Sequence, residues 1–126
     1  MTCTMHGFMV VEFERKNNMT LNEYQALAQR TAQITKEKYD KIVNGCMGLN
    51  GESGECIDIL KKHVFQGHTL DKQKLSEELG DVMWYCAELA TGLGMKLDDI
   101  AQENINKLLK RYPEGFDPER SIHREV

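Results

Sequence analysis

The sequence predicts an all-α protein with a four-helix, bundle-like core. Apolar residues recur at spacings of three, four and seven in four separate segments, which is typical of helices with one buried face. Both prolines lie near the C-terminus, so they do not interrupt these segments. The connections are short, and 126 residues suit a single domain.

The first helix is predicted over residues 21–36. Thr20 stands three residues ahead of Glu23, and this capping-box spacing marks the start of a helix. One side of the helix then carries Leu21, Tyr24, Leu27, Ala28 and Ile34. Residues 1–19 show no helical period, so we expect a loosely attached N-terminal arm ahead of the domain.

The second helix is predicted over residues 39–65, although it contains several glycines. Glycine occupies every third position from Gly45 to Gly54, and each one costs a helix about 1 kcal/mol relative to alanine. A helix that keeps them needs another backbone or a ligand to come close. The alternative is a break near residues 44–51 that divides the segment in two.

Two more helices follow the polar loop at 66–71. The third runs from Lys72 to about Leu93. The fourth begins after Asp98, a natural N-cap, and ends at Tyr112, because the residue before a proline disfavours the helical conformation. We therefore divide the chain into the arm at 1–19, a domain at 20–117 and a polar C-terminal tail at 118–126.

Charge and composition exclude several classes of function. The formal net charge of -4 gives no basic surface for a nucleic-acid backbone or an anionic membrane, so neither partner is expected. The sequence has no apolar run long enough to span a bilayer and no signal-peptide pattern at its start. Four cysteines without a CxxC pair are typical of a reducing compartment, so we expect a cytoplasmic location.

Two acid pairs flank the buried faces of the second and third helices. At about 100° per residue, Glu52 and Glu55 lie at the edge of the apolar stripe of the second helix. Glu78 and Asp81 hold the same place on the third helix, whereas Glu77 points away. If the pairs face each other, four carboxylates share a partly dry site, which requires raised pKa values or a counter-ion.

A divalent metal ion is the counter-ion that this pattern favours. Mg²⁺ takes carboxylates, water and substrate phosphates as ligands, and Mn²⁺ accepts the same oxygen ligands. Such an ion neutralises phosphate charge and lowers the pKa of an attacking water. The alternative is a solvated acidic surface that pairs with nearby lysines, namely Lys61, Lys62, Lys72 and Lys74.

The fourth helix and the aromatic residues supply further candidates. Asn104 falls within an apolar arc, and Lys107 and Arg111 project from the same general side, where they suit phosphate oxygens. The alternative is that the two cations extend over the core while Asn104 bonds a neighbouring backbone. Tyr85, at the border of the apolar arc of the third helix, is placed to contact a base or sugar, and the alternative is a structural role. Trp84 points almost opposite the buried face, so a second subunit is expected to cover it.

Three stretches together resemble a known family. They read "GLNGESGECIDILKK" from residue 48, "EELGDVMWYCAELA" from residue 77 and "NINKLLKRYPEGF" from residue 104. Their ExxE-then-ExxD order and the residues around it resemble the MazG-like nucleoside triphosphate pyrophosphohydrolases of the all-α NTP pyrophosphatase superfamily. The resemblance covers residues 21–117.

The resemblance implies hydrolysis of nucleoside triphosphates between the α- and β-phosphates in a nucleotide-pool housecleaning role. The products are a nucleoside monophosphate and pyrophosphate, and the cofactor is Mg²⁺, with Mn²⁺ as a substitute. The residues that match the metal-binding acids are Glu52, Glu55, Glu78 and Asp81. Glu52 or Glu55 is also expected to activate the attacking water. The matching substrate-binding positions are Tyr85, Asn104, Lys107 and Arg111.

The resemblance also implies a homodimer or homotetramer that shares helices between subunits. Oligomerisation would complete the thin four-helix core, with Trp84 at the interface. Two alternatives stay open. One is the same fold acting on phosphoribosyl-ATP, and the other is a non-catalytic helical module that binds a nucleotide or a partner protein and uses the acids as a structural cation site.

Overall fold

A computed structural model describes residues 18–34 and 37–124 of the chain, and the part it describes is all-helical. Most of the predicted N-terminal arm lies outside the described residues. The elements in chain order are α1 (Leu21–Ala28), the short 3₁₀ helix η1 (Gln29–Thr31), α2 (Lys38–Gln66), α3 (Lys72–Gly92), α4 (Leu97–Arg111) and α5 (Pro118–Ile122). The prediction of an all-α fold is confirmed.

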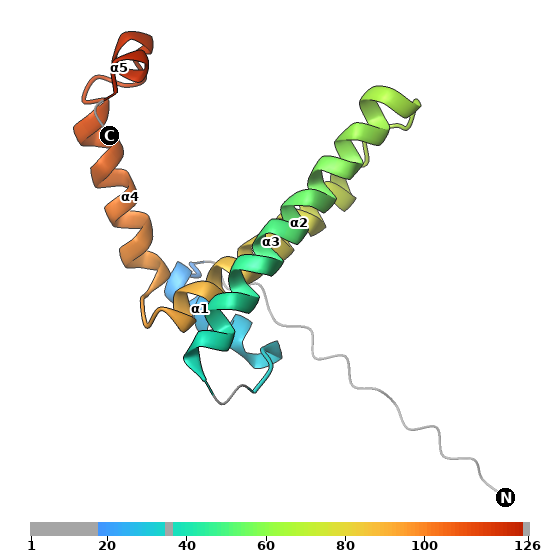
Figure 1. The fold of residues 1–126 in the computed structure, drawn as a ribbon, viewed down its shortest axis with the longest axis vertical. Coiled ribbons are helices and arrows are strands. Elements are labelled where there is room, and N and C mark those ends of the chain that lie inside the picture. The colour runs from blue at the N-terminus through green and yellow to red at the C-terminus, as the bar shows by residue number, and fades with distance from the viewer. Residues whose placement is uncertain (1–17, 35–36, 125–126) are drawn as a thin grey trace, which may run out of the picture.

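The central unit is a long antiparallel hairpin of α2 and α3 (Figure 1). Gly67 ends α2 in the left-handed conformation, at φ 72°, and Asp71 caps α3 by accepting the Lys74 N–H at 2.9 Å. Gly67 and Asp71 fix the two ends of the loop, because a left-handed glycine and a side-chain cap supply hydrogen-bond partners for the unpaired backbone groups at helix ends. The hairpin places residues of α2 beside residues of α3 along much of its length.

Glycines allow the two helices of the hairpin to approach closely. A Cβ atom at Gly45 would lie 2.9 Å from the backbone of Leu89, and one at Gly92 would lie 2.9 Å from the backbone nitrogen of Ile42. The predicted close approach at the glycines is therefore confirmed at Gly45. The alternative of a break near 44–51 is wrong, since α2 runs without interruption through that segment.

The first helix is shorter than predicted. Its capping box is present, with the Glu23 N–H donated to Thr20 Oγ1 at 3.0 Å and the Thr20 N–H donated to Glu23 at 2.9 Å. The α-helix nevertheless ends at Ala28, and η1 ends at Thr31. The Thr31 hydroxyl donates a hydrogen bond to the Ala28 carbonyl and accepts one from the Trp84 indole. Ile34, predicted on the apolar side of this helix, is fully exposed.

The interior of the described chain is thin. Its most buried apolar side chains are the small residues Ala28, Ala87 and Ala90, and the largest fully buried side chain is that of Glu88. Long apolar side chains on two helices are exposed instead, among them Val43, Met47, Ile57, Leu60 and Val64 on α2 and Ile105, Leu108 and Leu109 on α4. This amount of exposed apolar surface is the property expected of a subunit that a partner covers.

The α4 helix begins two residues earlier than predicted, and side chains of α1 accept the N–H groups at its start. Its first residue is Leu97, so Asp98 is inside the first turn and the prediction of Asp98 as N-cap is wrong. Gln25 accepts the Leu97 N–H at 2.8 Å, and Asn22 accepts the Asp98 N–H at 3.0 Å. From this contact α4 extends away from the hairpin, and the two form the arms of a V (Figure 1).

The predicted polar tail contains a further short helix, α5. Asp117 caps it by accepting the N–H of Glu119 at 2.9 Å, and Pro118 occupies the first turn, where its missing N–H costs nothing. Among the described residues, the helices lack the length and apolar character that crossing a membrane requires.

Candidate metal and substrate site

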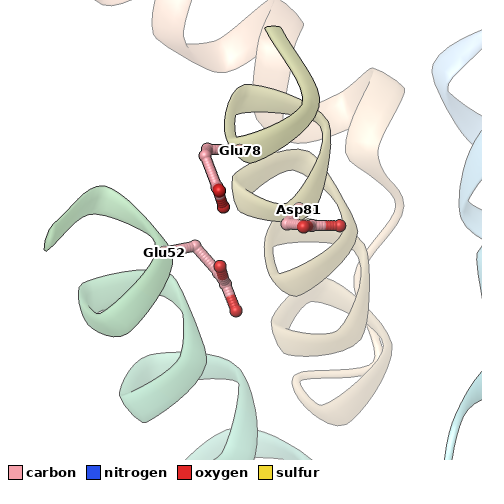
Figure 2. A group of neighbouring side chains, drawn as sticks. All are labelled: Glu52, Glu78 and Asp81. Atoms are coloured by element: carbon pink, nitrogen blue, oxygen red, sulfur yellow. The ribbon is translucent and has the colours of Figure 1, made fainter. Parts of the chain in front are cut away.

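Three carboxylates from the two helices of the hairpin converge. Glu52 extends from α2 toward Glu78 and Asp81 on α3 (Figure 2), and one carboxylate oxygen of each lies within 4.8 Å of the others. We call these three residues the acid cluster. Glu78 and Asp81 lie on one side of α3 because residues three apart on a helix are neighbours. The hairpin brings Glu52 opposite them.

Burial and the neighbouring carboxylates raise the pKa of Glu52. Partial burial, followed by the negative charges of Asp81, Glu78 and Glu55, raises the pKa of Glu52 above its ordinary value. Tyr24 of α1 also senses the cluster, because burial and then the charge of Asp81 raise the pKa of its hydroxyl. A site in which like charges oppose ionisation favours binding a cation.

Glu55 stands beside the acid cluster and outside it. Its side chain is exposed, and it is not among the three carboxylates that converge. Its charge nevertheless acts on Glu52 and raises the pKa of Lys62, behind the larger effect of Asp58. The structure therefore brings together three of the four predicted acids.

Two of the nearby lysines are paired with another carboxylate. Lys61 pairs with Asp58 at 3.0 Å, and Lys62 pairs with the other oxygen of the same carboxylate. Both cations that the solvated-surface alternative offered on α2 are thus bound to Asp58. Three carboxylates with oxygens this close fit a hard divalent cation, which prefers oxygen ligands and several of them. The residues that would hold it are Glu52, Glu78 and Asp81.

A pocket of about 360 Å³ adjoins the acid cluster. Its lining comes from three elements, with Thr31 of η1, Glu52 of α2, and Asp81, Trp84 and Tyr85 of α3. The position of Tyr85 beside the acids agrees with the sequence prediction. The pocket combines carboxylates with two aromatic rings, a set that suits a ligand with a charged end and a flat end.

Thr31 lines the pocket although the sequence pattern did not indicate it, and Trp84, for which the sequence predicts an interface, lines the pocket as well. Trp84 was expected on a free surface awaiting a second subunit, but it is half-buried against the end of α1. Its indole N–H is donated to the Ala28 carbonyl at 3.1 Å and to Thr31 Oγ1 at 3.0 Å. Because η1 turns here, the sequence pattern of a continuous helix concealed this contact.

The three predicted residues of α4 lie away from the acid cluster in the single chain. Asn104 is exposed, so the expectation of a buried amide within an apolar arc is wrong for the described chain. Lys107 and Arg111 instead line an open groove of about 650 Å³ between α4 and α5. We call this the basic groove, and its other lining residues are Lys110, Glu119, Arg120, His123 and Arg124.

A helical hairpin with three converging carboxylates beside two aromatic rings defines the class as an all-α protein with an acidic, aromatic-lined pocket. Residues 45–116, more than half of the chain, match the family model of the MazG nucleotide pyrophosphohydrolase domain. The chain belongs to this family, as its sequence motifs predicted. All four predicted acids lie within the matched segment.

A relative is found in Mycobacterium phage L5. Its Gene 37 protein is 42% identical over 73 residues, which are 55% of this chain and 64% of the phage protein. The chain thus spans less than two-thirds of that relative's length. No solved structure matches the chain significantly.

Proposed function

We propose that the protein hydrolyses nucleoside triphosphates between the α- and β-phosphates, in the presence of Mg²⁺ or Mn²⁺, and so removes unwanted nucleotides from the pool. The observation that carries the proposal is the acid cluster beside the aromatic pocket, on a hairpin that belongs to the MazG nucleotide pyrophosphohydrolase family. The products are a nucleoside monophosphate and pyrophosphate. Nucleoside triphosphates are a cytoplasmic pool, which agrees with the location expected from the sequence.

The acids of the hairpin take the metal-binding role in this proposal. Glu52, Glu78 and Asp81 would hold the cation, and Glu55, whose charge acts on Glu52, stands beside them. When bound, a divalent ion supplies charge neutralisation for phosphate oxygens and lowers the pKa of a water molecule. Displacement at phosphorus needs this positioning and charge balance more than a covalent nucleophile.

Glu55 is the favoured catalytic residue for the attacking water. A carboxylate that accepts a proton must stay available while the others bind the cation. Glu55 is exposed and stands outside the acid cluster, which leaves its oxygens available, whereas Glu52 is inside it. We therefore assign proton acceptance to Glu55 and orientation of the water to Glu52.

A homodimer or homotetramer is part of the same proposal. The exposed apolar side chains of α2 and α4 need cover, and α4 diverges from the hairpin within one chain (Figure 1). We propose that the α4 residues Asn104, Lys107 and Arg111 contact the substrate of a neighbouring subunit in this assembly. Size-exclusion chromatography with light scattering measures the assembly, and a monomer at working concentration would contradict it.

The test of the reaction is a substrate panel with product identification. The protein is incubated with each common and modified nucleoside triphosphate, and with phosphoribosyl-ATP, in the presence of Mg²⁺. Anion-exchange chromatography then separates monophosphate and pyrophosphate from diphosphate and phosphate. We expect monophosphate and pyrophosphate from at least one nucleoside triphosphate, and loss of both in Asp81→Asn with the helical circular dichroism unchanged.

Other outcomes assign the protein elsewhere. Turnover of phosphoribosyl-ATP alone would keep the reaction and change the substrate. Saturable binding of Mg²⁺ and nucleotide without any monophosphate would indicate the non-catalytic binding module. Diphosphate and phosphate as products, or full turnover in Asp81→Asn, would overturn the proposed reaction.

A further inference from the structure

We infer that Trp84 binds the nucleobase of the substrate by stacking, as one wall of a rigid aromatic corner that it forms with Tyr85. The inference rests on the proposed function, since it concerns the substrate of the same site. It assigns Trp84 to substrate binding in place of the subunit interface that the sequence predicted. Thr31 is the positioning residue that holds the indole.

The two aromatic rings and part of the acid cluster share one pocket. Trp84 and Tyr85 line the same pocket as Glu52 and Asp81, two members of the acid cluster. A nucleotide whose phosphates face these carboxylates through a cation has its base at the other walls of the pocket, and those walls are aromatic. Flat aromatic side chains bind bases through their faces whatever the base identity.

Contacts within the protein hold the rings of Trp84 and Tyr85 in place before a ligand binds. The ring centroids of Trp84 and Tyr85 are 5.0 Å apart, with an interplanar angle of 84°, so the two rings form perpendicular walls. The Tyr85 ring lies directly against Gly48 of α2, where a methyl group would overlap it. A site whose side chains are already in place loses less conformational entropy on binding.

The hydrogen-bond donors of Trp84 and Thr31 are engaged within the protein. The indole has one N–H, and it is shared by the Ala28 carbonyl and Thr31 Oγ1. The Thr31 hydroxyl hydrogen is in turn donated to the same Ala28 carbonyl at 3.2 Å. Neither group has a donor left for a base edge. Trp84 therefore adds affinity for any planar base and contributes little to the choice among bases.

Steady-state kinetics of two kinds of ligand test the inference. In Trp84→Leu we expect the KM for the best nucleoside triphosphate to rise about tenfold, as for loss of one stacking contact, with kcat within about twofold, as for a contact made equally in ground and transition states. The inhibition constant of tripolyphosphate, which has no base, should stay unchanged. An unchanged KM, or equal weakening of tripolyphosphate, would overturn the inference.

Positioning by Thr31 has its own pair of variants. Thr31→Ser keeps the hydroxyl and should keep the wild-type KM, whereas Thr31→Val removes it and should raise the KM for the nucleotide but not the inhibition constant of tripolyphosphate. Equal KM values in Thr31→Ser and Thr31→Val would remove Thr31 from the proposal.

Phe65→Leu is the matched aromatic control for Trp84→Leu, because Phe65 is 81% exposed at the end of α2 and lines neither the pocket nor the basic groove. It should leave the KM unchanged.

A binding measurement on the wild-type protein covers the case in which a variant does not fold. Trp84 is the single tryptophan of the chain, so its fluorescence reports this pocket alone. A nucleoside triphosphate with a non-hydrolysable α,β bridge should quench it in the presence of Mg²⁺, and tripolyphosphate should not. Absence of quenching by the nucleotide, or equal quenching by both ligands, would overturn the inference. Quenching without turnover of the natural substrates would contradict the proposed reaction alone.

Discussion

The acid cluster and the basic groove differ in how firmly the fold holds them. The cluster and its pocket form where η1, α2 and α3 pack together, with helix backbones in close contact at Gly45 and Gly92. The basic groove lies between α4 and α5, and most of its charged side chains are exposed. Cation binding requires fixed oxygen positions, whereas attraction of a polyphosphate tolerates movement of long cationic side chains. The carboxylates thus lie on closely packed helices, whereas the cationic side chains lie on an exposed surface.

The largest expected effect is loss of turnover in Glu78→Gln, within the acid cluster. A neutral amide cannot replace a charged ligand of the cation, and we expect kcat/KM to fall by at least about 100-fold. Release of pyrophosphate measures it. The control is Glu77→Gln, since Glu77 is exposed on the same helix and outside the cluster. Equal activity in the two variants would remove Glu78 from the metal site.

The next effect is on stability at the aromatic wall. Gly48→Ala places a methyl group against the Tyr85 ring, and overpacking of this kind costs about 2 kcal/mol of unfolding free energy. Gly51→Ala is the control on the same helix, because its Cβ meets open space and the better helix former should stabilise by about 0.5–1 kcal/mol. Urea unfolding measures both. Stabilisation by both substitutions would show that the Tyr85 ring moves aside freely.

A smaller effect is expected in the basic groove. In Arg111→Ala, loss of a charge-assisted hydrogen bond to phosphate should raise the KM about tenfold, or about 1.4 kcal/mol. The effect should weaken in high salt because the side chain is only partly buried. Lys72→Ala at the start of α3 is a charge-matched control. Identical KM values for the two variants would exclude the groove from substrate binding.

The smallest effect is a pH dependence of the metal-free protein. The folded-state pKa of Glu52 is raised, so the folded protein binds this proton more tightly than the unfolded chain. Stability should therefore increase as the pH falls from 7 through the raised pKa, and then level off near the ordinary value of 4.5. Thermal unfolding in EDTA measures it. In Glu52→Gln the increase should shrink, and the same increase in both proteins would rule out Glu52 as its source.

Much of the hairpin could be predicted from local sequence patterns. The apolar period locates the two helices of the hairpin, as the capping box at Thr20 locates the start of α1, because such effects act within one or two turns. The angular positions of Glu52, Glu78 and Asp81 followed from the helical repeat, and the structure brings these three together. Glycine spacing also indicated close contact, which Gly45 makes with Leu89.

Features that depend on contacts between distant segments could not be predicted in this way. The indole N–H of Trp84 is donated to Ala28 and Thr31 where α1 meets η1, and amide side chains of α1 cap the start of α4. Glu88 of α3 is another example, because it is a charged residue and yet its side chain is only 1% exposed. It is buried as an ion pair with Lys41 at 3.3 Å and a hydrogen bond from Gln29 at 3.0 Å. No local pattern distinguishes it from a surface glutamate.

The short α1–η1 segment precedes the part of the chain that the family model matches, which begins at residue 45. It nevertheless holds the indole of Trp84 through Thr31 and caps α4 through Gln25. Chains that share the hairpin but differ in these few residues should therefore differ in how firmly the indole of Trp84 is held and in where α4 points. A segment only eleven residues long thus positions parts of the molecule on both sides of it.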